Sequence, residues 1–149
     1  MEKEVPLTKY TLIFGVGYFA ALVLVGVAVR IFDIGGSAGA TPGALFAGAI
    51  IVVSRFLQDN RRPPSRSEKS KLAVLSLVMA WLVSIVLAAL AMLLFGDIFG
   101  IQELFQTGGA GIYFGVAAFF SFLYFVLLSF AYGPMAKKNF EAMRRKGKL

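Results

Sequence analysis

The chain has 149 residues, of which 58% are hydrophobic and 15% are charged, and its formal net charge is +7. A soluble domain carries about 45–50% apolar and about 25% charged residues, so this chain has too few polar side chains to cover a water-soluble globule. It contains no Cys and no His. Disulfides, thiolate and imidazole metal sites, iron–sulfur clusters and catalysis by Cys or a Ser-His pair are therefore excluded. The composition predicts an integral membrane protein that is not an enzyme and holds no cofactor.

Four apolar runs follow one another at residues 11–32, 42–56, 72–95 and 111–132. A membrane-spanning helix needs about 20 apolar residues. The second run is short, and we expect it to continue toward residue 58 while Arg55 reaches the headgroups. Barrel strands are shorter and alternate in polarity, unlike these runs. We predict an all-α, four-helix transmembrane bundle of two antiparallel hairpins in one domain, with helices at about 10–32, 42–58, 66–95 and 110–133 and a basic tail at 134–149.

The first run raises the question of a cleaved signal peptide, because Ala38-Gly39-Ala40 resembles a small-residue cleavage site. The run exceeds the roughly 7–15 apolar residues of a signal peptide. The charges before it are also balanced between Lys and Glu. We expect the first helix to be retained.

Local signals mark the helix ends. Thr41-Pro42 is typical of a cap followed by proline at the first helical position. Ser65 with Glu68 three residues later is a capping-box pattern, which predicts the start of the third helix. Gly133-Pro134 should kink or end the fourth helix.

Basic residues gather on one side of the predicted bundle. The segments 55–71 and 137–148 hold twelve of the fifteen Lys and Arg residues, whereas the segments 33–41 and 96–110 hold none. Short loops rich in Lys and Arg stay cytoplasmic, so we expect both termini in the cytoplasm. We attribute the net positive charge to topology and to attraction for anionic lipid headgroups rather than to nucleic-acid binding.

The predicted loop between the second and third helices contains Arg62, Pro64, Ser65 and Glu68. It resembles the Arg-x-Pro-Ser/Thr-x-x-Glu loop of an uncharacterised family of small four-helix bacterial inner-membrane proteins. The resemblance extends to the chain length and to the plan of four spans with basic inner loops. It implies a location in the bacterial inner membrane and no particular activity. The same Ser and Glu also fit an ordinary capping box.

The third and fourth helices each carry a stripe of small and weakly polar side chains. These are Ala73, Ser76, Ala80, Ser84, Ala88 and Ala91 on the third helix, and Tyr113, Ala117, Ser121, Tyr124, Leu128 and Tyr132 on the fourth. No ionisable residue lies in the central part of any run, which argues against a carboxylate-driven antiporter.

Three polar-tipped aromatic side chains fall near mid-membrane. Tyr18, Trp81 and Tyr124 lie away from the interfaces that Tyr and Trp prefer, and we expect them to face inward, where their O–H and N–H groups find partners. With Ser84 and Ser121 they form a candidate intramembrane polar cluster. Two interpretations remain open: a packing seam between helices, or a pocket for a ligand or solute.

Small residues at four-residue spacing are candidate helix-packing positions. They comprise Gly39, Gly43 and Ala47 in one segment and Gly111 and Gly115 in another. This spacing lets helices approach closely, either within the bundle or between two chains.

The sequence therefore predicts a non-enzymatic integral inner-membrane protein, either a small accessory subunit or a module that binds lipid or a protein partner. Its expected partners are anionic lipid headgroups and a membrane protein or second copy, without nucleic acid. The alternatives are a small oligomeric transporter or channel and a toxin or bacteriocin immunity protein. A polar, water-reachable cavity through the bundle would favour transport; a dry core with an exposed small-residue face would favour a partner. The basic tail is expected to be either an amphipathic surface helix or a solvated segment.

Overall fold

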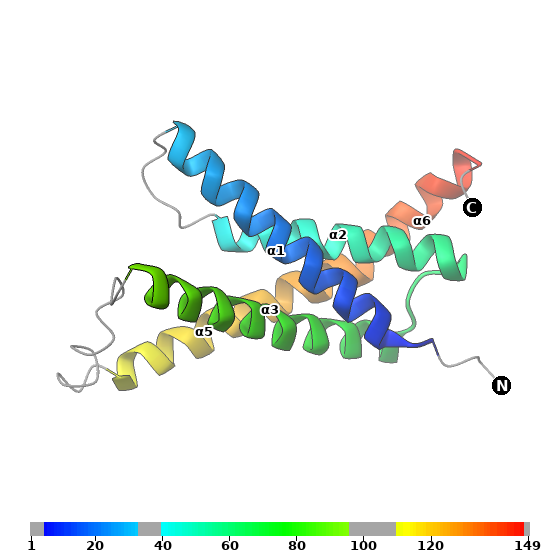
Figure 1. The fold of residues 1–149 in the computed structure, drawn as a ribbon. Helices are drawn as coiled ribbons and strands as arrows, with labels where there is room; N and C mark the ends of the chain where they lie inside the picture. Colours follow the sequence, from blue (N-terminus) through cyan, green and yellow to red (C-terminus); the bar gives the residue numbers. More distant parts are fainter. Residues whose placement is uncertain (1–4, 33–39, 96–109, 148–149) are drawn as a thin grey trace.

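A computed structural model describes residues 5–32, 40–95 and 110–147, and within these residues the only regular structure is helical (Figure 1). The helices are α1 (Leu7–Phe32), α2 (Ala40–Asn60), α3 (Arg66–Phe95), α5 (Ala110–Phe130) and α6 (Ala136–Arg145), with a π-helical turn at Ala131–Met135 between the last two. Four spans are long and apolar enough to cross a membrane. The predicted all-α, four-helix fold is confirmed.

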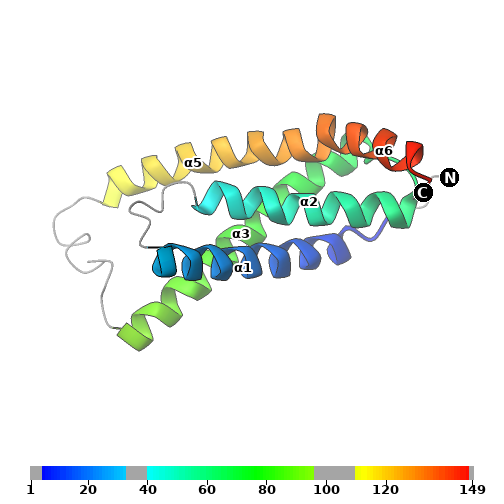
Figure 2. The same ribbon diagram turned by 90° about the horizontal axis from the view of Figure 1, so that it is seen from above.

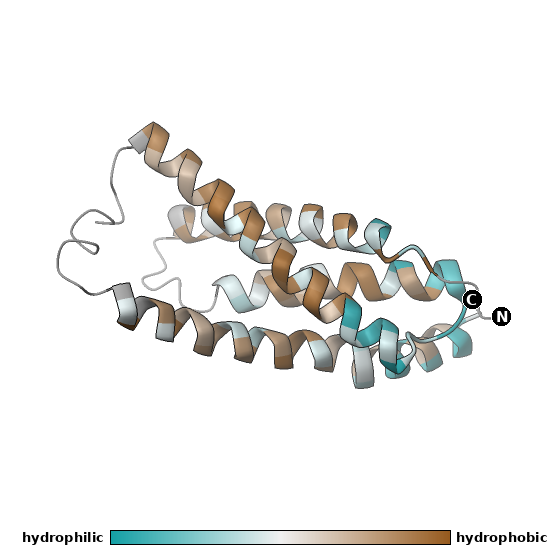
Figure 3. Cartoon of the chain, turned by 90° about the horizontal axis from the view of Figure 1, so that it is seen from below, coloured by the Kyte–Doolittle hydropathy of each residue, from teal (hydrophilic) through white to brown (hydrophobic). Residues whose placement is uncertain are grey.

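The four spans alternate in direction and form two antiparallel hairpins (Figures 1 and 2). Both chain termini and the connection between α2 and α3 lie at one end of the bundle, which we call the terminal end. The opposite end, where α1 and α3 finish and α2 and α5 begin, is called the far end. Hydrophilic residues gather at the terminal end (Figure 3), in keeping with the concentration of basic residues there.

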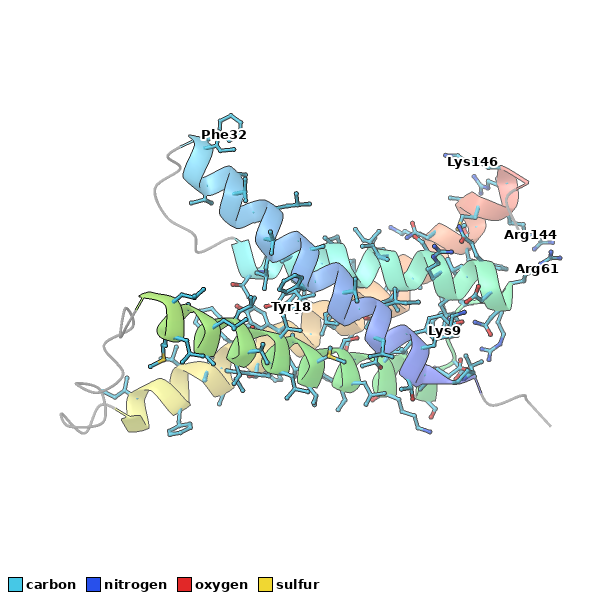
Figure 4. The ribbon with its side chains drawn as sticks, in the orientation of Figure 1. Lys9, Tyr18, Phe32, Arg61, Arg144 and Lys146 are labelled. Carbon is cyan, nitrogen blue, oxygen red and sulfur yellow. The ribbon has the colours of Figure 1, made fainter. Side chains whose placement is uncertain are left out.

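The packed core occupies the half of the bundle nearer the terminal end. Every long helix contributes fully buried side chains to it, among them Phe14, Leu45, Phe56, Leu72 and Leu128. Toward the far end the helices separate, and the last turns of α1 leave the others, so that Phe32 projects away from the bundle (Figure 4). Apolar side chains in this open half face outward, as expected where lipid replaces protein as the neighbour.

The least hydropathic of the four spans, α2, is also the most buried. It packs against α1, α5 and α6. A Cβ atom on Gly17 would lie 3.6 Å from the Cα of Gly48, and a Cβ on Gly48 would lie 3.2 Å from the Phe14 ring. The absence of side chains at these two glycines therefore permits the close approach of α1 to α2.

The fourth span does not end at Gly133-Pro134. The chain passes through the π-helical turn, which contains Pro134, and continues helically to Arg145. Proline lacks an N–H and its ring clashes with a preceding carbonyl, and the wider π turn accommodates both effects. The helix changes direction there (Figures 1 and 2), so the predicted kink is confirmed, whereas a helix end at residue 133 is wrong.

The predicted tail at 134–149 is largely helical. Ala136 is buried, and Phe140 and Met143 pack against the core, while the basic side chains of α6 are exposed. Part of the apolar side of this helix therefore rests on the protein. The other boundaries agree with prediction to within three residues, and α3 begins and ends as predicted.

Candidate functional site

A cavity of about 240 Å³ lies where the packed half of the bundle gives way to the open half. The cavity exists because α2 is shorter than α1, with 21 against 26 residues, and because the helices diverge beyond this level. Its lining comes from all four spans and consists of Tyr18, Thr41, Leu45, Leu77, Ala80, Trp81, Ser84, Ala117, Phe120 and Tyr124.

The structure brings the predicted polar cluster together at this cavity. Tyr18, Trp81, Ser84 and Tyr124 line it. The Tyr18 hydroxyl and the Ser84 Oγ are 3.2 Å apart and share a hydrogen bond between α1 and α3. The Trp81 Nε1 donates to the Ser121 Oγ at 3.1 Å, which connects the fifth member and joins α3 to α5.

The three aromatic rings differ in how far they turn inward. Tyr18 is 1% exposed, as expected. Tyr124 is partly buried, and its hydroxyl has no hydrogen-bond partner among the described residues. Trp81 is 42% exposed, so the expectation of an inward ring is only partly met. The indole N–H donates to Ser121 while the ring reaches the surface.

The packing seam lies directly beside the cavity on the terminal side. The Ser76 Oγ and the Tyr132 Oη are 2.7 Å apart in a fully buried hydrogen bond. Ala73 and Leu128, from the same two predicted stripes, are also fully buried. The two interpretations of the stripes thus apply at different depths: the stripes form a buried seam toward the terminal end and line a cavity farther along.

The lining of the cavity is neutral. It offers hydroxyl groups, an indole and aromatic and aliphatic surfaces, and no charged side chain is among its residues. In the described part of the chain, no three acidic side chains come close enough to hold a metal ion. The cavity is suited to an uncharged, mostly apolar molecule with a hydrogen-bonding group.

The residues of the predicted loop motif form one hydrogen-bonded unit between α2 and α3. The Ser65 backbone N–H donates to the Glu68 carboxylate at 2.8 Å, and the Glu68 N–H donates to the Ser65 Oγ at 3.3 Å. The predicted capping box is confirmed. Both guanidinium N–H groups of Arg62 also donate to Glu68, each at 2.7 Å, and the guanidinium lies 5.8 Å from the centre of the Phe56 ring. Pro64 precedes the capping residue.

A second polar network at the terminal end was not anticipated from the sequence. The Lys9 Nζ and the Tyr10 hydroxyl donate to Asp59 at 2.8 and 3.0 Å, and the Asn60 amide donates to the Tyr10 hydroxyl at 2.9 Å. Lys9 and Tyr10 lie at the start of α1, and Asp59 and Asn60 lie at the end of α2, so the network joins the two helices at the terminal end. The sequence gives one signal for this network: Lys9 and Tyr10 directly precede the first apolar run, and Asp59 and Asn60 follow the second, so an antiparallel hairpin brings them to the same level.

Three of the predicted small-residue positions have no close neighbour in the described part of the bundle. A Cβ atom on Gly43, Gly111 or Gly115 would meet no other described residue within 4 Å, because these glycines lie in the open half. Packing of these three glycines against another helix is therefore not seen among the described residues. Ala47 is partly buried, but the close contact of α2 is made one residue later, at Gly48. Gly39 lies outside the described residues.

Comparison with protein-family models, with curated proteins and with solved structures gives no match. The function is therefore argued from the geometry of the cavity and from the chemistry of its lining.

Proposed function

We propose that this is a non-enzymatic, multi-pass protein of the bacterial inner membrane that binds an uncharged amphiphilic molecule in its intramembrane cavity. The observation that carries the proposal is the cavity itself. It gathers hydrogen-bonding side chains from separate helices at a depth where polar groups are costly unless they serve packing or binding.

Size and chemistry limit the ligand. An apolar cavity of about 150 Å³ is large enough for benzene, and this cavity has about 240 Å³. It therefore has room for one ring with a substituent, or for part of a hydrocarbon chain. The Tyr124 hydroxyl has no hydrogen-bond partner among the described residues and is available to a hydroxyl or carbonyl group on the ligand, while Leu77 and Phe120 contact the apolar part of the ligand. A hydroxyl- or carbonyl-bearing hydrocarbon satisfies these requirements.

Binding fits the geometry better than conduction by a single chain. The buried Ser76–Tyr132 seam and the fully buried Leu45 and Leu128 separate the cavity from the terminal end. A solute that entered the cavity would meet packed side chains rather than a continuous path. Among the classes predicted from the sequence, an accessory subunit or binding module is therefore favoured over a transporter. We also propose that the basic terminal end faces the cytoplasm. The chain would then belong to the family of small inner-membrane proteins that it resembles in its loop motif.

The test uses a photoactivatable medium-chain alcohol that carries a diazirine, with the full-length protein in detergent micelles. Ala117→Leu narrows the cavity from α5, and Ala118→Leu adds the same atoms one residue later at an exposed position. We expect crosslinks near Trp81 and Tyr124 in the wild type. Labelling should fall by about tenfold, equivalent to about 1.4 kcal/mol, in Ala117→Leu and stay unchanged in Ala118→Leu. Equal labelling of the two variants would overturn the proposal.

A further inference from the structure

A separate groove of about 570 Å³ runs between α1 and α2 on the outer surface of the bundle. It shares no lining residue with the intramembrane cavity. Its terminal end is charged, with Lys9, Arg55 and Asp59. Farther along, its walls are apolar and include Leu12 and Val16.

The length of the groove corresponds to one leaflet of a bilayer. Its residues on α1 extend from Lys9 to Ala20, a distance of about 16 Å at 1.5 Å per residue. The hydrocarbon core of a bilayer is about 30 Å thick, so the groove covers about half of it. Charge therefore lies at one boundary of the core and apolar surface reaches its middle, which is the polarity profile of a single phospholipid.

The charges at the terminal end favour an anionic headgroup. Asp59 is the one acidic lining residue, and it already accepts hydrogen bonds from Lys9 at 2.8 Å and from Tyr10 at 3.0 Å. Arg55 lies one helical turn from Asp59, is exposed, and makes no ion pair with any described residue. With two basic side chains and one acidic side chain, the lining of the groove carries a net charge of +1. The Arg55 side chain is long enough to reach a phosphate at the interface.

The apolar part has the shape of a channel for a single hydrocarbon chain. Gly17 and Ala20 contribute almost no side chain to the lining, which keeps the groove open between the two helices. Leu12 and Val16 are exposed, Val16 by 71%, and Ile51 faces them from α2, close to Gly17. An acyl chain lying here would contact both helices at once.

We propose that this groove binds one anionic phospholipid from the leaflet at the terminal end, with its phosphate at Arg55 and one acyl chain along Leu12, Val16 and Ala20. The site is independent of the proposed function, because a molecule in the intramembrane cavity would touch none of these residues. Bound here, the lipid would contact α1 and α2 beside the place where Gly17 and Gly48 bring the two helices close together.

The test is native mass spectrometry of the full-length protein released from nanodiscs that contain equal amounts of phosphatidylglycerol and phosphatidylcholine. We expect the wild type to retain one phosphatidylglycerol preferentially. Arg55→Gln should reduce the ratio of bound phosphatidylglycerol to phosphatidylcholine at least fivefold. Arg66→Gln removes the same charge from an exposed position at the terminal end outside the groove and should leave the ratio unchanged.

A second variant tests the acyl-chain part without touching a charge. Ala20 is exposed, so Ala20→Phe fills the groove without entering the core, and it should reduce retention of both lipids. Equal loss of selectivity in Arg55→Gln and Arg66→Gln would show diffuse attraction to the basic end and overturn the proposal. Retention of the two lipids in their nanodisc proportion, or a bound second copy of the chain in place of lipid, would overturn it as well. Crosslinking of the diazirine alcohol in the cavity reports separately on the proposed function.

Discussion

Tyrosine hydroxyls on the fourth span have different surroundings at two depths. Tyr132 is buried in the seam, and its hydroxyl shares a hydrogen bond of 2.7 Å with the hydroxyl of Ser76, whereas Tyr124 lines the cavity and is partly buried. The first hydroxyl is part of the protein's own packing. The second is available to a ligand.

This difference predicts unequal costs for the same substitution. Tyr132→Phe leaves the buried Ser76 hydroxyl without its partner, which should lower the free energy of unfolding by about 1–3 kcal/mol. Tyr124→Phe removes an unpaired hydroxyl and should change stability by less than about 0.5 kcal/mol while weakening labelling by the diazirine alcohol. Thermal unfolding of both variants in detergent measures the difference. A larger loss for Tyr124→Phe would mean that the cavity hydroxyl, not the seam, holds the helices together.

At the scale of the helices, the contact between α1 and α2 depends on glycines that leave no space for a side chain. A Cβ on Gly48 would lie 3.2 Å from Phe14, whereas one on Gly43 would meet no described neighbour within 4 Å. Both glycines belong to α2, so they form a matched pair for measuring the contact.

Gly48→Leu should destabilise the protein by about 1–3 kcal/mol, because the added atoms force the two helices apart. Gly43→Leu should be neutral to within about 0.5 kcal/mol, or slightly stabilising because glycine is a poor helix former. The comparison requires unfolding measurements for the two variants under the same conditions. Equal destabilisation of both variants would mean that Gly43 packs against something outside the described residues, such as a second chain.

The sequence was sufficient for those elements whose limits depend on local chemistry. The start of α3 was predicted because Ser65 and Glu68 form a hydrogen-bonded unit within four residues, and its end because the apolar run stops at residue 95. The fourth span was predicted too short because Pro134 usually ends a helix, and nothing local indicated that a π turn would absorb it.

Contacts between helices were harder to predict, because they depend on how each helix is rotated about its axis. The stripes on α3 and α5 were identified, and both members of the Ser76–Tyr132 pair lay on them, but a stripe does not determine which residues meet at which depth. The network of Lys9, Tyr10 and Asp59 had no periodic signal. For the glycines, a four-residue spacing pointed to Gly43 although the contact is at Gly48, because the sequence does not show where the bundle opens.

At the scale of the whole molecule, one end is basic and tightly packed, whereas the other is open and has a single charged residue, Arg30, in its described helices. The described parts of the two segments in which Lys and Arg gather, 55–71 and 137–147, lie at the terminal end. In a bacterial membrane such an asymmetry predicts that the terminal end faces the cytoplasm. The proposed lipid would then come from the cytoplasmic leaflet, and the cavity would lie near the membrane centre.

The most direct test of this arrangement uses the absence of cysteine in the chain. Ser67→Cys places a single thiol at an exposed position of the terminal end, and Gly111→Cys places one at an exposed position of the far end. Labelling with a membrane-impermeant maleimide is compared between right-side-out and inverted inner-membrane vesicles. We predict that Ser67→Cys reacts only in inverted vesicles and Gly111→Cys only in right-side-out vesicles. The reverse pattern, or reaction of both cysteines from the same side, would contradict the four-span arrangement with a cytoplasmic basic end.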